Sequence, residues 1–385
     1  MKSVATHRSA SVETVVREIA TFLVEDCDLP GASVHMRTPG EEAGACAGIA
    51  DRSLNTSVSP THRFHMASVT KTYVAVLIWK VVEAGELSLD TPIQDLVAAE
   101  RLAMILDGRS AEGITVRHLL QHCSGLPDIA TLANHREAYR RTRQRPIRAV
   151  TFSEALELSR NSTFRELPSG SERNAPRDCY SYSSINTELL ADIVERYMGK
   201  TIRAAVADEI IRPLGLAATA LENGYTPDQP APPGLAIGYS RINPDPSLAD
   251  LAEESSAMDW CYAMYRHYLV PSLVASPADM MTFFHALLVD QTLIGPDLVT
   301  RMTEDTIPVS ESRPHLRCGL GMFGRRDPFI IWHNGLMLGY KAVALYVPST
   351  RTLVTACANG DWPTGQGLAS WILAHLQEYG YAEMQ

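Results

Sequence analysis

The strand-like segments of this chain lie at its two ends, and the segments between them are mostly helix-like. Near the N-terminus, a helical pattern at about residues 11–26 precedes two short strand-like segments, 30–39 and 44–51. The C-terminal part closes with a helical segment at 365–380, and three more strand-like segments precede it: 329–335, 340–348 and 352–360. Strands separated in this way indicate one sheet that is assembled from both ends of the chain.

The middle of the chain, from Ser68 to about residue 290, is mostly helical in pattern. Apolar residues recur at helical spacing in five segments: 114–128, 152–161, 184–200, 201–215 and 277–290. We find no internal repeat, low-complexity tract or flexible linker. The chain is therefore predicted to be a single α+β domain, 1–385, with an α/β lobe at about 1–66 and 291–385 and an inserted helical lobe at about 67–290. Clefts between two such lobes are common active sites.

Composition and charge exclude several classes of function. The 385 residues are 45% hydrophobic and 20% charged, as in ordinary globular proteins. The net charge of -10 disfavours non-specific binding to nucleic acids or anionic membranes. No apolar run approaches the roughly 20 residues of a membrane span. Segment 1–27 has no continuous apolar stretch typical of a signal peptide, and the seven cysteines form no C-x-x-C pair. These features predict a cytoplasmic protein with reduced thiols.

Lys71 is an unusual charged residue, because the sequence has only five lysines and the rest of its 34 basic residues are arginines. Ser68 precedes it by three residues, so the two share a face if a helix begins near Ser68. Burial among apolar neighbours destabilises the charged form of a lysine, which can then take the proton of a serine hydroxyl. Arginine could not act as such a base. The alternative is an N-capping serine followed by a lysine whose stem covers apolar surface.

Two further segments place polar residues where a helix or a strand begins or ends. Tyr182 directly precedes the helical segment that starts near residue 184. Its hydroxyl either stays in water above a packed ring or relays a proton. His333 and Gly335 lie in a C-terminal strand, and Gly335 would permit a close approach of the strand backbone to a cleft. The alternative is a histidine at a strand end followed by turn glycines.

The three segments, in this order, resemble the motifs of the serine β-lactamase and penicillin-binding-protein-like family: S-x-x-K, then Y-x-N or Y-x-S, then K-T-G or H-x-G. The blocks GELSLDTPIQDLV and HNGLMLGYKAVALYVP are similar as well, and the resemblance extends over roughly residues 12–362. The branch in question contains class C β-lactamases, esterases and D-aminopeptidases, and segment 182–200 is similar to 6-aminohexanoate-dimer hydrolases. The resemblance implies a β-lactamase-like fold with an antiparallel sheet flanked by helices.

The resemblance also implies a role for each matching residue. Ser68 would be the acylated nucleophile, and Lys71 and Tyr182 would move its proton to the leaving group. The backbone N–H groups of Ser68 and Leu336 would form an oxyanion hole. The chemistry would need no metal and no cofactor. Four more residues would bind or shape the pocket for the substrate, a small ester, amide or peptide: Ser184, His333, Asn334 and Gly335.

Two positions depart from the β-lactamase pattern. Ser184 stands where many β-lactamases carry Asn, and a hydroxyl offers one donor where an amide offers two. His333 stands where they carry Lys, so the cation that would hold a substrate carboxylate is missing unless His333 is protonated. These departures favour an esterase, a D-amino-acid amidase or peptidase, or a transacylase over a β-lactamase or DD-peptidase, although some DD-peptidases have H-x-G. A catalytically silent binding or regulatory protein is a further alternative, which the intact Ser68, Lys71 and Tyr182 disfavour.

Other patterns support different functions less well. The segment GLGMFG, 319–324, matches G-x-G-x-x-G but precedes a turn and a strand instead of a helix. His118 and His122 have an i,i+4 spacing that can bind zinc, but they lack an H-E-x-x-H motif and are predicted to be structural. The absence of G-x-S-x-G excludes an α/β-hydrolase elbow. Six arginines gather between Arg136 and Arg148, which is typical of a solvated face but could also receive an acidic substrate or a carrier protein.

Overall fold

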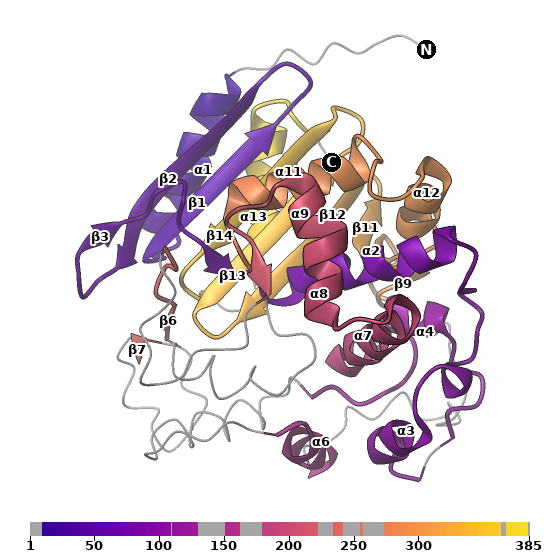
Figure 1. Cartoon of the computed structure of the whole chain (residues 1–385). Coiled ribbons are helices and arrows are strands. Elements are labelled where there is room, and N and C mark those ends of the chain that lie inside the picture. Colours follow the sequence, from indigo (N-terminus) through magenta and orange to yellow (C-terminus); the bar gives the residue numbers. More distant parts are fainter. Residues whose placement is uncertain are drawn as a thin grey trace, which may run out of the picture.

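A nine-stranded antiparallel sheet forms the centre of the protein (Figure 1). The computed structural model describes residues 10–108, 110–129, 151–161, 179–221, 234–241, 255–256, 273–362 and 367–383. The N-terminal strands are β1 (Gly31–Arg37), β2 (Glu42–Asp51) and β3 (Thr56–Ser57). The C-terminal strands are β9 (Ile307–Pro308), β10 (Leu316–Cys318), β11 (Phe323–Arg326), β12 (Phe329–Met337), β13 (Tyr340–Val347) and β14 (Thr352–Ala358).

The strand order β3-β2-β1-β14-β13-β12-β11-β10-β9 joins the two ends of the chain. Strand β1 pairs with β14 in a register that sets Ala32 opposite Ala358. The prediction of one antiparallel sheet assembled from both chain ends is therefore confirmed.

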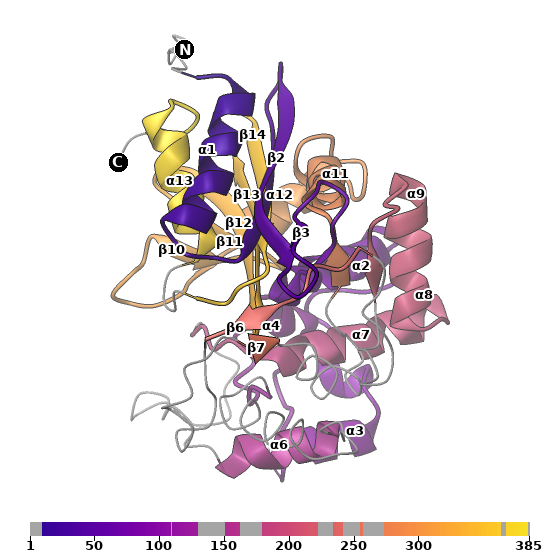
Figure 2. The same ribbon diagram turned by 90° about the vertical axis from the view of Figure 1, so that its left-hand side faces the viewer.

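Helices cover both faces of this sheet (Figure 2). Helices α1 (Val12–Glu25) and α13 (Leu368–Glu378) lie on one face, and α11 (Pro277–Leu288) packs on the other, against β1 and β14. Every residue of β13 and β14 is buried. Because apolar clusters lie on both sides of the sheet, these strands read as nearly continuous apolar runs instead of alternating ones.

The inserted segment contributes most of the remaining helices. Helix α2 (Thr70–Glu83) is buried around most of its circumference, which is typical of a helix at the centre of a domain, and it packs against α7 (Ser184–Met198). The other described helices are α3 (Ala99–Leu106), α4 (Val116–Leu120), α6 (Phe152–Asn161), α8 (Ile202–Val206), α9 (Arg212–Leu214) and α12 (Pro296–Glu304). Helix α8 continues into α9 through a π-helical turn at Ala207–Ile211.

The structure differs from the predicted elements in two places. The helix predicted at 114–128 is limited to α4, because His122 and Gly125 have positive φ angles of 51° and 73° and leave the helical path. Short strands also occur in the region predicted to be mostly helical, because strands of two or three residues are too short to show a sequence pattern. Strands β5 (Ala220–Leu221) and β8 (Leu273–Ala275) form a sheet with β4 (Phe64–His65), and β6 (Tyr239–Ser240) pairs with β7 (Ser255–Ser256).

The two-lobe division remains a prediction, with one qualification from the packing. Helix α11 precedes the predicted boundary at residue 291, yet it packs on the sheet and so belongs with the α/β layer. In the described ranges, no helix combines the length and the apolar character that crossing a membrane requires.

Candidate active site

Ser68 lies in a short turn of 3-10 helix, Ala67–Val69, that runs directly into helix α2. The backbone N–H of Met66 donates to the carbonyl oxygen of Leu273 at 2.8 Å and so ties the turn to β8. Ala67 has a positive φ of 46°, which is uncommon for a residue with a side chain. The residue before Ser68 is thus held in a strained backbone conformation, of the kind that clusters at functional sites.

The Ser68 hydroxyl contacts both side chains that the sequence predicts as its partners. Lys71 Nζ donates to Ser68 Oγ at 3.1 Å, and Ser68 Oγ lies 2.7 Å from Tyr182 Oη. Lys71 Nζ is also 5.2 Å from the centre of the Tyr182 ring. The N-cap of α2 is Val69, so Ser68 is not the helix-capping serine of the alternative interpretation. The three half-buried side chains form one hydrogen-bonded cluster.

Tyr182 owes its position to the fixed start of helix α7. Ser183 is the N-cap of this helix, and its Oγ donates to the carbonyl oxygen of Pro127 at 2.6 Å. The N–H of Ser184, the first residue of α7, donates to Asp128 Oδ1 at 2.9 Å. The helix start is therefore bonded at two points to the loop after α4, and Tyr182 immediately precedes it.

Strand β12 passes directly beside the turn that carries Ser68. A Cβ atom at Gly335 would lie 2.0 Å from the carbonyl oxygen of Met66 and 3.3 Å from Cβ of Ala67, so the approach requires glycine. Strand β11 pairs with β12 only as far as Trp332, and the free part of the β12 edge contacts the turn. Leu336 follows Gly335 there, with a side chain that is 57% exposed.

His333 and Asn334 face opposite sides of the sheet, because successive side chains of a strand alternate. His333 lines a cavity beside Lys71. The Asn334 side chain instead lies against Gly367, at the start of α13, and its Oδ1 is buried without a hydrogen-bond partner in the described part of the chain. The structure therefore brings Ser68, Lys71, Tyr182, His333 and Gly335 together, but it does not bring the Asn334 side chain to the site.

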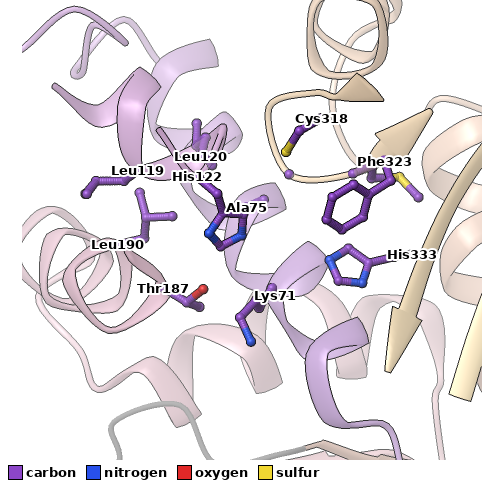
Figure 3. A pocket seen from close by; sticks show the side chains of 12 residues that line it. Lys71, Ala75, Leu119, Leu120, His122, Thr187, Leu190, Cys318, Phe323 and His333 are labelled. Atoms are coloured by element: carbon purple, nitrogen blue, oxygen red, sulfur yellow. The ribbon is translucent and has the colours of Figure 1, made fainter. Parts of the chain in front are cut away.

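The cavity beside Lys71 is narrow and is lined by two histidine rings that face each other, as Figure 3 shows. Its volume of about 10 Å³ for the centre of a water molecule matches a single water. Burial, with a smaller contribution from the nearby Lys71, lowers the pKa of His333 to about 4 and that of His122 to about 3. Both rings are therefore neutral at pH 7, and the H-x-G position carries no positive charge.

Two motifs weighed in the sequence have other outcomes. His118 Nδ1 accepts the N–H of Thr115 at 3.0 Å and so caps α4, which is a structural role. The cluster Arg136–Arg148 lies outside the described residues. The sequence did not indicate that the His122 ring stacks on Tyr182, with ring centres 4.4 Å apart. Only the i,i+4 spacing from His118 singled out His122, and that spacing contains no information on Tyr182.

Comparisons with known proteins identify the family of the chain. A sequence profile described as "Beta-lactamase" matches residues 16–378. Esterase EstB of Burkholderia gladioli is 30% identical over 202 residues, 52% of this chain and 47% of the esterase. Penicillin-binding protein 4 of Amycolatopsis lactamdurans is 28% identical over 189 residues, 49% of this chain and 44% of that protein. The matches thus span about half the length of these curated relatives.

The fold has similar solved structures. The D-amino acid amidase of Ochrobactrum anthropi SV3, complexed with L-phenylalanine, superposes with a TM-score of 0.74 at 20% identity, over 95% of this chain and 98% of that chain. At this identity the likeness shows the fold alone. An antiparallel sheet with an inserted helical segment and a Ser–Lys–Tyr cluster between them defines a β-lactamase-like protein. The chain belongs to the beta-lactamase family, a family of serine hydrolases.

Proposed function

We propose that the protein is a hydrolase or acyltransferase that cleaves an ester or amide through an acyl-Ser68 intermediate. The observation that carries the proposal is the position of Ser68 Oγ, which is within hydrogen-bond distance of both Lys71 Nζ (3.1 Å) and Tyr182 Oη (2.7 Å). A serine hydroxyl is a weak nucleophile until a neighbouring base takes its proton. A serine that only caps a helix or packs in the core would not need two candidate bases at these distances.

The proposed reaction has two steps. Ser68 Oγ attacks the carbonyl carbon while its proton passes to Lys71 or Tyr182, and the same pair then delivers the proton to the departing alcohol or amine. Water, or another nucleophile in a transfer reaction, releases the acyl group from Ser68 Oγ. The backbone N–H groups of Ser68 and Leu336 would donate to the oxyanion, since β12 and the Ser68 turn are in direct contact.

The substrate class follows from the charge of the pocket. A neutral His333 offers no cation to hold a substrate carboxylate. Phe323, whose ring centre lies 5.3 Å from that of His333, and the exposed Leu336 side chain add apolar surface. We therefore expect uncharged acyl groups in esters or amides to react faster than β-lactams, whose carboxylate would have no ionic partner. The name of one curated relative, an esterase, is consistent with this range, whereas that of another, a penicillin-binding protein, corresponds to the alternative of a β-lactamase or DD-peptidase.

We further propose that the protein works in the cytoplasm. In the described ranges, no two of the six cysteines form a disulfide with each other, which fits a reducing compartment. The cluster Arg136–Arg148 is proposed as a contact for an acidic substrate or carrier protein, on charge alone.

A fluorophosphonate probe tests the covalent mechanism directly. The wild-type protein should be labelled stoichiometrically at Ser68, and Ser68→Ala should lose labelling and ester turnover while it keeps its melting temperature. Ser57→Ala, in the exposed strand β3, is the matched control and should be labelled like the wild type. A silent binding protein would leave the wild type unlabelled. Nitrocefin hydrolysis at the rate of a dedicated β-lactamase would instead contradict the proposed substrate class.

A further inference from the structure

His122 supports the ring of Tyr182. It lies on the turn after α4, is 6% exposed, and its ring is stacked on that of Tyr182 with an interplanar angle of 28°. The Tyr182 hydroxyl at the far end of the ring is 2.7 Å from Ser68 Oγ. A tilt of the phenol ring about its attachment would therefore change this distance. The inference that follows rests on the proposed function, because it concerns how Tyr182 is held for reaction with Ser68.

Two hydrogen bonds fix the His122 ring and its proton, and a third orients one of their donors. The backbone N–H of Ser183 points at His122 Nδ1 from 3.3 Å and can only donate, so Nδ1 must be the unprotonated nitrogen. Asn186 Nδ2 lies 3.0 Å from the same atom, and Ser124 Oγ donates to Asn186 Oδ1 at 2.6 Å, which orients the amide. The proton of the neutral ring is consequently on Nε2. All of these partners are buried.

Across the cavity, His333 has the complementary arrangement. Its Nδ1 lies 2.9 Å from the carbonyl oxygen of Asn334, which can only accept, so Nδ1 carries the proton and Nε2 is an acceptor. The Nε2–H donor of one ring and the Nε2 acceptor of the other have no hydrogen-bond partner among the described residues, and the two rings lie on facing walls of a cavity about the size of one water (Figure 3). The titratable groups around His122 are Lys71 on α2, His333 on β12, Cys318 on β10, and Tyr180 and Tyr182 on the segment before α7.

We propose that His122 is a positioning residue for Tyr182: the bonds from Ser183 and Asn186 hold its buried ring in one tautomer and at one angle. A charged ring here would disfavour any positive charge on Lys71, because like charges repel at short distance. A rotating ring would let the phenol move, and displacements of about 1 Å in a reacting group can cost about 100-fold in rate. The neutral, locked ring prevents both effects.

The decisive variant is His122→Asn. An Asn side chain can keep an acceptor near the place of Nδ1 for Ser183 and Asn186, but it removes the plane under Tyr182. We expect kcat for a p-nitrophenyl ester to fall about 10- to 100-fold with little change in KM or melting temperature. The matched control is His118→Asn, which alters the histidine four residues earlier, whose Nδ1 accepts the N–H of Thr115, and its kcat should stay within about twofold of the wild type.

A double-mutant cycle separates positioning from general structural support. If His122 acts through Tyr182, then His122→Asn made in the Tyr182→Phe protein should cause little further loss of kcat. Full additivity of the two losses, or wild-type kinetics of His122→Asn, would overturn the inference. If His122→Asn does not fold, Asn186→Asp provides a second measurement. A carboxylate can only accept, so it draws a proton onto Nδ1, and the acid limb of the kcat/KM profile should move to higher pH. An unchanged profile would overturn the inference.

These outcomes are distinct from failure of the proposed function. A wild-type protein that the fluorophosphonate does not label would overturn the acyl-Ser68 mechanism, and the role of His122 in it. A wild-type protein that is labelled, with a His122→Asn variant that is labelled equally fast, would overturn only the role of His122.

Discussion

Gly335→Ala tests the contact on which the site geometry depends. The new Cβ would lie 2.0 Å from the carbonyl oxygen of Met66 and 3.0 Å from its carbonyl carbon, whereas Cβ atoms essentially never come within 3.0 Å of another heavy atom. Strand β12 and the Ser68 turn must therefore separate by about 1 Å. Both partners are backbone, so no side chain can rotate away to make room.

The expected cost has two parts. Overpacking of this kind destabilises a protein by about 1–3 kcal/mol. A displacement of about 1 Å between Ser68 and the Leu336 backbone should lower the acylation rate by about 100-fold, because the nucleophile and the proposed oxyanion donors lie on the two parts that separate. The loss of activity should thus exceed what the loss of folded protein explains, since a fold with several kcal/mol of stability remains almost fully populated.

The measurement is the rate constant of fluorophosphonate labelling under conditions where nearly all of the protein is folded. The melting temperature is recorded in parallel. Gly324→Ala is the matched control, because a Cβ there meets only the carbonyl oxygen of Ile330 at an ordinary 3.5 Å. The control should keep both values. Wild-type labelling by Gly335→Ala would refute the reasoning that β12 and the Ser68 turn are held at this separation.

Three further predictions follow from the same contacts. Lys71→Arg should lose nearly as much ester turnover as Lys71→Ala, since arginine keeps the charge but cannot act as a base; near-wild-type kcat in the arginine variant would reassign the proton route. Tyr182→Phe should lower kcat by about 10²–10⁴-fold with little change in folding. Tyr180→Phe should change kcat only mildly, because Tyr180 contacts His122 and Phe323 at ring edges and no contact joins it to Ser68 in the described residues. Burial lowers the pKa of His333 from 6.5 to about 4, so the unfolded chain binds more protons than the folded one between these pH values, and stability should fall as the pH drops from 6.5 towards 4. Thermal melts across this window should show a shallower decline in stability for His333→Gln than for the wild type. An equal decline would exclude His333 as a source of the pH dependence.

Much of the fold was predictable because apolar patterns are local properties of the sequence. Strand-like runs at both ends of the chain predicted the joined sheet, which the pairing of β1 with β14 bears out. The spacing of Ser68 and Lys71 predicted their contact, since residues three apart share a helix face. Gly335 was predicted to permit a close backbone approach, and the Met66 carbonyl oxygen is the atom that requires it.

Other features depend on contacts between segments that are far apart in the chain. Asn334 was grouped with its neighbours His333 and Gly335, but strand alternation turns its side chain to the opposite face, against Gly367. A motif names consecutive residues, and only the orientation of the strand in the sheet decides which of them face the cleft.

The sequence by itself predicted the fold class, the contact of Ser68 with Lys71, and a close backbone approach at Gly335. Only the tertiary structure decided that Tyr182 reaches Ser68, that His122 lies under its ring, and that His333 is neutral. The physical reason is that desolvation and long-range hydrogen bonds set the charge and angle of a side chain, and both arise from packing among α2, α7 and β12 that no local pattern specifies.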